Sequence, residues 1–315
     1  MPTGQLNEHY LNSKLLRHNP MGNPSRRKVL VYTPPGYNKK ENYPCLMFLP
    51  GFGGGPEKWH GKDFPAHRLL DLLILSGEIP PVILCTVDGM SRLGGSQYID
   101  SALNGPYMSH IVKEIVPFLQ NKYPIHSTIN LCGHSSGGFG ALSLGSLYPE
   151  IFPRVASFAG DMYFELTHKN MLSGFINDYR SGKLGQNLKE FLASEKFHYV
   201  LGLAAAYSPN LRKASWKMDF PIDWNNAEIN DKVWQKWLAL DPINWIQARK
   251  EKLKKLDLIY LSCGEQDQYA LHLGADCFAA RCKKNGISCV NESHEGNHSL
   301  LIQQLERGFK ILLKS

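Results

Sequence analysis

Short runs of apolar and β-branched residues alternate with helical patterns along this chain, and this alternation restricts its fold more than any other feature. It is typical of a mostly parallel β-sheet with helices on both faces. The expected strands are residues 28–33, 44–49, 82–87, 128–132, 154–158, 256–262 and 287–292. The clearest helix is expected over 111–119, where Pro117 should cause a kink or a restart. The last helix should begin near His298.

The segment 161–249 interrupts the alternation. It contains several helical patterns and five of the six tryptophans, but no convincing strand. We therefore expect a single domain over residues 1–315 with a helical, aromatic-rich insertion at 161–249. Insertions in open α/β sheets rise from the carboxyl ends of the strands, where ligands bind, so this one should form a lid or a pocket wall. For Trp234 and Trp237, three residues apart on an expected helix, we favour the alternative that they fill a small core of the insertion itself.

The residues GHSSGGFG at 133–140 directly follow an expected strand. Glycine and serine are ordinary turn residues, so a turn without chemistry would explain them. Gly133, Ser135 and Gly137 also fit the G-x-S-x-G pattern of a nucleophile elbow, a strained turn between strand and helix that exposes the serine hydroxyl. The flanking glycines matter there because a Cβ atom would collide with neighbouring strands. A helix of small residues should follow.

A nucleophilic serine needs a base within hydrogen-bond distance, a carboxylate that orients the base, and N–H donors for the oxyanion. Asp267 and His298 each follow one of the last two expected strands, so both should lie at the carboxyl edge of the sheet. The order Ser135, Asp267, His298 is the order of an α/β-hydrolase. Glu265 is an alternative acid, although it is two residues nearer to the end of its strand.

Two backbone N–H groups are candidates for the oxyanion hole. One belongs to Ser136, the residue after the candidate nucleophile, and the other to Phe52 in the turn PGFGGG. Backbone donors suit this task because their positions are fixed before charge develops on the carbonyl oxygen. The same glycines do not form a dinucleotide-binding motif, because Pro56 occupies the last glycine position of G-x-G-x-x-G. A plain structural loop remains the alternative.

These motifs together resemble the esterase family that includes S-formylglutathione hydrolase, enterochelin esterases and the antigen 85 mycolyltransferases. The matching stretches span most of the chain and are VYTPPGY (31–37), LPGFGGG, VDG (87–89), QYIDS (97–101) with the following EIVPFL, GHSSGGFGAL, GEQD and GNH. Two departures stand out. The segment 161–249 looks longer than in S-formylglutathione hydrolase, and no secretion signal like that of a cell-envelope mycolyltransferase is visible.

The resemblance implies an α/β-hydrolase fold in which Ser135 is the nucleophile, His298 the base and Asp267 the acid. It also implies that the N–H groups of Phe52 and Ser136 form the oxyanion hole.

Three further residues are candidates for substrate contacts, namely His134, Trp59 and Asp161. His134 directly precedes the candidate nucleophile, where a packed, hydrogen-bonded histidine is more common than a catalytic one.

His294, Glu295 and His298 spell H-E-x-x-H, the zinc-binding pattern of many metalloproteases. That pattern needs a helix across all five residues, whereas Gly296 and Asn297 lie between the histidines directly after an expected strand. We therefore expect a loop, no metal site and no cofactor.

Composition excludes several classes of protein. The net charge is +7, but the lysines and arginines are scattered, and the densest group, at 249–255, reads as one solvated helix face, so we expect no nucleic-acid partner. No apolar stretch approaches the roughly 20 residues of a membrane span, and the N-terminus lacks a secretory pattern, so we expect a cytoplasmic protein. The seven cysteines include four in apolar runs, which should be buried, reduced thiols: Cys45, Cys85, Cys132 and Cys263.

The sequence thus predicts a serine carboxylic-ester hydrolase that acts through an acyl-enzyme on a small or aryl/acyl ester. Two alternatives remain open: a thioesterase or acyltransferase with the same triad, and a hydrolase-fold binding protein without turnover. A small-molecule ester is the expected partner, and a homodimer is possible.

Overall fold

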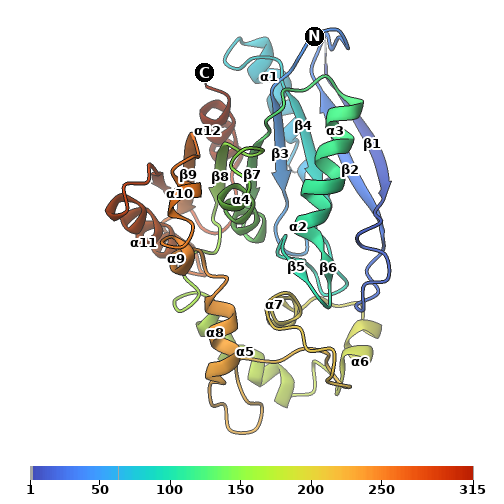
Figure 1. Cartoon of the computed structure of the whole chain (residues 1–315), viewed down its shortest axis with the longest axis vertical. Helices are drawn as coiled ribbons and strands as arrows, with labels where there is room; N and C mark the ends of the chain where they lie inside the picture. The colour runs from blue at the N-terminus through green and yellow to red at the C-terminus, as the bar shows by residue number, and fades with distance from the viewer. Residues whose placement is uncertain (1–2, 63, 315) are drawn as a thin grey trace.

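The computed structural model describes residues 3–62 and 64–314, and it shows an eight-stranded sheet with helices on both faces (Figure 1). The order of strands in the sheet is β1-β2-β4-β3-β7-β8-β9-β10. The strands from β4 to β10 in this order pair in parallel, whereas β1 and β2 add an antiparallel edge. The predicted mostly parallel α/β-hydrolase sheet is confirmed. Its strands are β1 (Gln5–Asn12), β2 (Arg26–Thr33), β3 (Cys45–Leu49), β4 (Ile83–Val87), β7 (Asn130–His134), β8 (Arg154–Phe158), β9 (Leu258–Gly264) and β10 (Val290–His294).

All seven expected strands are present, with ends shifted by no more than three residues. Three strands were not expected: β1 and the two-residue pair β5 (Asp100–Ser101) and β6 (Gly105–Pro106). The sequence of β1, QLNEHYLN, contains no β-branched residue and is largely exposed. Only its pairing with β2, from Gln5 opposite Thr33 onward, makes it a strand.

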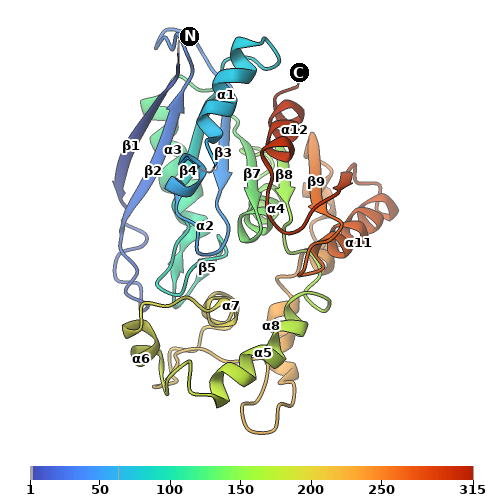
Figure 2. The same ribbon diagram turned by 180° about the vertical axis from the view of Figure 1, so that it is seen from behind.

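Helices pack on the two faces in different groups. One face carries α1 (Ala66–Leu75) and α12 (Ile302–Leu313), which Figure 2 shows in front of the sheet. Their apolar side chains form a core with Leu46, Phe48 and Cys132. The other face carries α2 (Tyr107–His110), α3 (Val116–Lys122), α4 (Ser136–Leu147) and α11 (Leu271–Lys284), and its larger core continues into the segment 161–249.

The expected helix over 111–119 is present with an irregularity before Pro117. A π-helical stretch, Ile111–Ile115, joins α2 to α3. Pro117 lies directly after this stretch, in the first turn of α3, and the backbone is still helical at Ile115, with φ −72° and ψ −47°. The expected irregularity at Pro117 takes the form of a π-helical stretch, and the helix continues through it without a restart.

The last helix does not begin near His298. It begins at Ile302, and His298 lies in the loop between β10 and α12. Hydrogen bonds to other parts of the chain hold the loop in place. One of them runs from the N–H group of Gln266 to the carbonyl oxygen of Gly296. His298 is consequently placed by loop contacts and not by a helix end.

The segment 161–249 contains helices and no strand. They are α5 (His168–Arg180), α6 (Leu188–Ala193), α7 (Tyr199–Tyr207), α8 (Asp231–Leu238) and α9 (Pro242–Trp245), with α10 (Lys250–Leu253) following. Figures 1 and 2 both show the segment gathered at one end of the sheet. Trp234 and Trp237 are 2% and 0% exposed, as expected for residues that fill a core.

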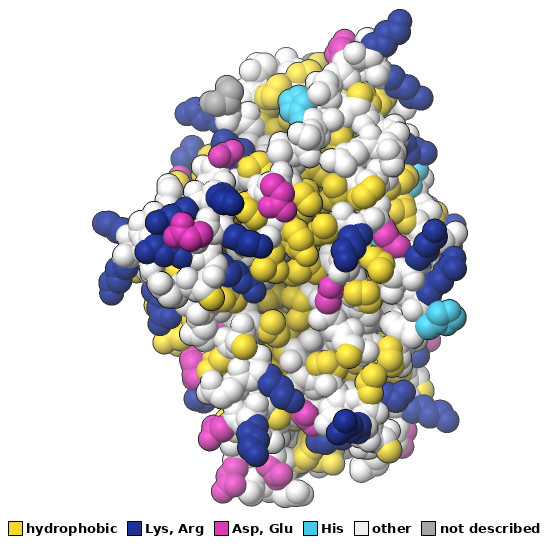
Figure 3. Space-filling view, viewed as in Figure 1, with side chains coloured by type: hydrophobic (Ala, Val, Ile, Leu, Met, Phe, Trp, Pro, Cys, Tyr) yellow, Lys and Arg dark blue, Asp and Glu magenta, His cyan; other side chains and the backbone are white. Residues whose placement is uncertain are grey.

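No helix among the described residues is long and apolar enough to cross a membrane. All seven cysteines are free, and the four expected to be buried are buried. Figure 3 shows basic and acidic side chains interspersed on one face, around a central apolar area over α4.

Candidate active site

The turn around Ser135 has the geometry of a nucleophile elbow. Strand β7 ends at His134, α4 begins at Ser136, and Ser135 between them has φ 56° and ψ −122°. A positive φ is costly for a residue with a side chain, so the surrounding packing must hold it. A Cβ atom added to Gly137 would lie 1.8 Å from the carbonyl oxygen of Leu49, which explains why only glycine fits there.

Ser135, His298 and Asp267 form one hydrogen-bonded chain. The distance from Ser135 Oγ to His298 Nε2 is 3.0 Å, and that from His298 Nδ1 to Asp267 Oδ2 is 2.8 Å. Because an ionised carboxylate can only accept, Nδ1 carries the proton and Nε2 is free to accept the serine proton. The structure thus brings together three residues that are up to 163 positions apart in the sequence.

The Asp267 side chain is completely buried, but its oxygens accept several hydrogen bonds. Burial alone would raise the pKa of Asp267. The hydrogen bond and charge of His298, together with the N–H groups of Tyr269 and Leu271, outweigh burial and hold the pKa below its ordinary value. Asp267 therefore stays ionised at neutral pH.

Glu265 and the H-E-x-x-H pattern do not form alternative sites. Glu265 Oε1 accepts a hydrogen bond from Ser293 Oγ at 2.9 Å, whereas Asp267 contacts His298. His294 ends β10, and Gly296 has φ 144°, so the pattern lies on a strand end and a loop. No cluster of three or more metal-ligating side chains occurs among residues 3–62 and 64–314.

The two candidate oxyanion donors lie on either side of Ser135 in the sequence and beside it in space. Ser136 is the first residue of α4, and a residue there has no acceptor for its N–H within the helix. A Cβ atom added to Gly51 would lie 3.3 Å from Ser135 Cβ, so the backbone that leads to Phe52 runs directly beside the serine. The N–H groups of the next two residues, Gly53 and Gly54, are already used in backbone hydrogen bonds.

Two cavities adjoin this centre and share Phe52. The first has a volume of about 280 Å³ and is lined by Phe52, Ser135, Asp161, Met171, Tyr199, Tyr269, Leu271 and His298. The second has a volume of about 240 Å³ and is lined by Gly51, Phe52, Gly54, Lys58, Trp59, Phe64 and His134. The first cavity is largely apolar and aromatic, as is typical of sites for small organic ligands.

The three candidates for substrate contacts fall into different cavities. Asp161, 2% exposed, lines the first cavity and accepts a hydrogen bond from the Tyr199 hydroxyl at 2.9 Å. Trp59 and His134 line the second. His134 donates from Nε2 to the carbonyl oxygen of His298 at 2.8 Å. Burial, with a smaller contribution from the neighbouring His298, lowers the pKa of His134 to about 4, so it is an uncharged packing residue at neutral pH.

Four residues of the first cavity were not expected from the sequence: Met171, Tyr199, Tyr269 and Leu271. Tyr269 and Leu271 follow Asp267 closely, so their proximity to the site could have been inferred. Met171 and Tyr199 lie on α5 and α7, and nothing in their local sequence distinguishes them from the other aromatic and apolar residues of the segment.

Solved structures of similar fold are esterases and related hydrolases. A ferulic acid esterase has 17% identity and a TM-score of 0.68, with 100% of this chain and 99% of that chain covered. The fluorophosphonate-binding serine hydrolase F of Staphylococcus aureus has 13% identity and a TM-score of 0.66, with 99% and 100% covered. An S-formylglutathione hydrolase from Agrobacterium tumefaciens has 14% identity and a TM-score of 0.63, with 100% and 96% covered. At such low sequence identities, the structural similarity establishes the fold alone.

The family description "Putative esterase" matches residues 22–300, a stretch that runs from the end of the first loop to the loop of His298. With this match on an α/β-hydrolase fold, the chain belongs to the putative esterase family and is an ester hydrolase of the serine carboxylesterase class.

Proposed function

We propose that Ser135, His298 and Asp267 catalyse the hydrolysis of a carboxylic ester through an acyl-enzyme on Ser135. The observation that carries this proposal is the hydrogen-bonded chain from Ser135 Oγ through His298 to Asp267, with distances of 3.0 and 2.8 Å. The elbow geometry of Ser135 supports it, because the strained turn lifts the hydroxyl away from the sheet.

In the first step Ser135 Oγ attacks the carbonyl carbon of the ester while His298 Nε2 accepts the serine proton. The carbonyl oxygen becomes an oxyanion, which the N–H groups of Phe52 and Ser136 would stabilise. When the tetrahedral intermediate collapses, the bond to the alkoxy oxygen breaks and His298 returns the proton to the leaving alcohol. Water, deprotonated by His298, then releases the acid from Ser135 by the same route. Throughout, Asp267 orients His298 and stabilises its charged form.

We further propose that the apolar cavity of about 280 Å³ receives the acyl group. Its aromatic lining favours a small aryl or acyl chain over a charged one, and Asp161 and Tyr199 add a polar patch to its wall. The second cavity shares Phe52 with the first and is suited to the leaving alcohol.

The test of catalysis is labelling with a fluorophosphonate. Wild type should be labelled once, at Ser135, and should hydrolyse p-nitrophenyl acetate, whereas Ser135→Ala should do neither. Labelling without turnover of any ester would instead favour a binding protein. Wild-type turnover that survives Ser135→Ala would overturn the proposal.

The test of substrate is a panel of p-nitrophenyl esters of increasing acyl length, aryl esters, sugar acetates and S-formylglutathione. We expect the highest kcat/KM among small acyl or aryl esters. A higher value for S-formylglutathione would assign the thioesterase alternative to the same triad, and partition of the acyl group to an added alcohol would assign an acyltransferase.

A further inference from the structure

The ring of Phe52 lies in a socket made by glycines from two distant segments. A Cβ atom added to Gly94 would lie 2.5 Å from Phe52 Cζ, one added to Gly95 would lie 2.9 Å from Cδ2, and one added to Gly202 would lie 2.6 Å from Cε2. Real Cβ atoms essentially never approach other atoms so closely. In addition, the N–H group of Gly53 donates to the carbonyl oxygen of Gly94 at 2.8 Å. The Phe52 ring and the backbone next to it therefore have little freedom to move.

One wall of this socket is α7, which belongs to the segment 161–249. Besides Gly202, α7 contributes Tyr199, whose ring meets the Phe52 ring edge-on with 5.0 Å between the ring centroids. The Tyr199 hydroxyl is itself fixed by its hydrogen bond to Asp161. Such aromatic contacts have a preferred geometry, so they restrain orientation as well as position.

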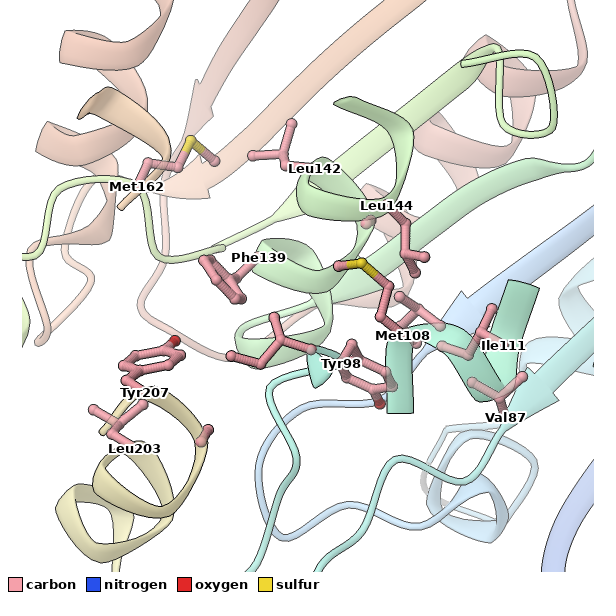
Figure 4. Packing of buried hydrophobic residues seen from close by; sticks show 14 of the residues in the cluster. Val87, Tyr98, Met108, Ile111, Phe139, Leu142, Leu144, Met162, Leu203 and Tyr207 are labelled. Atoms are coloured by element: carbon pink, nitrogen blue, oxygen red, sulfur yellow. The ribbon is translucent and has the colours of Figure 1, made fainter. Parts of the chain in front are cut away.

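The helix α7 is also fixed to the nucleophile elbow. Its residues from Val200 to Tyr207 are all buried. Figure 4 shows Tyr207 beside Phe139, which lies on α4 directly behind the elbow, and the two ring centroids are 6.0 Å apart. A hydrogen bond also joins α7 to β5, because Ser101 Oγ donates to the carbonyl oxygen of Ala205 at 2.6 Å. A single rigid helix thus contacts the ring of Phe52 and the helix that carries Ser136, the two residues whose N–H groups we assign to the oxyanion hole.

We propose that the socket of Gly94, Gly95, Gly202 and Tyr199 positions the Phe52 N–H group for the oxyanion, so that the segment 161–249 contributes to the chemical step and not only to the choice of substrate. This inference rests on the proposed function. Its physical basis is that an oxyanion hole works because its donors are fixed before charge develops, and a displacement of about 1 Å in such a group can cost on the order of 100-fold in rate. Gly202 acts through Phe52 and is a positioning residue.

The test is Gly202→Ala, which places a methyl group against the Phe52 ring from the α7 side. We expect kcat for p-nitrophenyl acetate to fall by about 10- to 100-fold, with KM changed by less than about threefold. The inhibition constant of an aryl trifluoromethyl ketone, whose hemiketal oxygen would occupy the oxyanion hole, should rise by a similar factor. The affinity for the matching aryl ether, which has no carbonyl oxygen to enter the oxyanion hole, should stay within about threefold of wild type.

Gly174→Ala is the matched control. Gly174 lies on α5 in the same segment, and an added Cβ atom there has no neighbour within 4 Å, so kcat and the ketone inhibition constant should both stay at wild-type values. Phe52→Leu, alone and in the Gly202→Ala background, tests whether Gly202 acts through the ring, because leucine keeps the N–H group but lacks the ring that the socket holds. The Phe52→Leu variant should lose kcat and ketone affinity as Gly202→Ala does, and the double variant should lose little more than Phe52→Leu alone.

Gly95→Ala places a methyl group against the ring from the other segment of the socket and decides the question if Gly202→Ala does not fold. A folded Gly202→Ala or Gly95→Ala variant with wild-type kcat and ketone affinity would overturn the role of the socket, as would a loss confined to KM or losses that multiply in the double variant. These outcomes require an active wild type. An inactive wild type, or activity that survives Ser135→Ala, would contradict the proposed function instead.

Discussion

Ser135 and Ser136 are adjacent in the sequence but are assigned different tasks. Ser135 Oγ contacts His298, whereas Ser136 Oγ is buried and accepts a hydrogen bond from Gln97 Nε2 at 3.1 Å. We predict that Ser135→Ala lowers kcat at least about a thousandfold without loss of the fold, because it removes the nucleophile. Ser136→Ala keeps its N–H group and should be much milder. Steady-state kinetics of the two variants, with circular dichroism as the check on folding, compare them, and a larger loss for Ser136→Ala would refute the elbow assignment.

The two acidic residues of the sequence GEQD provide a second comparison at this scale. Asp267→Asn keeps the size of the side chain but removes the charge that stabilises protonated His298 and fixes its tautomer. We expect kcat to fall by about a thousandfold or more, as in other triads. Glu265→Gln should keep most of the activity, since Glu265 contacts Ser293 and not His298. If Glu265→Gln were the more damaging variant, the acid of the triad would have to be reassigned.

At the scale of elements, α5 contributes Met171 to the wall of the first cavity. Met171→Ala enlarges the cavity without touching the triad. We therefore predict that kcat/KM for bulky acyl groups rises relative to that for acetyl, while fluorophosphonate still labels Ser135. Leu211→Ala, at a 48% exposed position in the same segment, is the control and should leave the ratios unchanged. An equal loss for every ester in Met171→Ala would mean that α5 has no part in selecting the acyl group.

At the scale of the whole molecule, the half-buried His60 and His134 are uncharged at neutral pH. Burial, with a smaller contribution from neighbouring charge, lowers the pKa of His60 to about 3 and that of His134 to about 4. The unfolded chain binds these protons near its ordinary pKa of about 6.5, and the folded protein does not. Stability is therefore fully present above about pH 6.5 and is lost as the pH falls toward about 4, by at most about 1.4 kcal/mol per pH unit for each such group.

Urea unfolding at pH 7, 6, 5 and 4.5 measures this loss. His60→Gln removes one titrating group and should give a shallower dependence of the unfolding free energy on pH. His126→Gln, at an exposed position, should leave the dependence as in wild type. Equal slopes in wild type and His60→Gln would show that the buried histidine does not contribute.

The sequence by itself predicted the parallel sheet, the elbow and the three residues that we propose as the triad, because each depends on a local signal. Strands such as β3 are apolar along their whole length, and glycines at 133 and 137 are required by the close approach of neighbouring backbone. Asp267 and His298 follow strands whose carboxyl ends meet at one edge. Only the tertiary structure decided where β1 pairs, that His298 lies in a loop before α12, and that Met171 and Tyr199 reach the cavity. It alone also decided that Gly202, 150 positions after Phe52 in the chain, lies against the ring of Phe52. The physical reason is that these features depend on contacts between segments far apart in the chain, and the residues involved carry no periodicity or turn signal that specifies their partner.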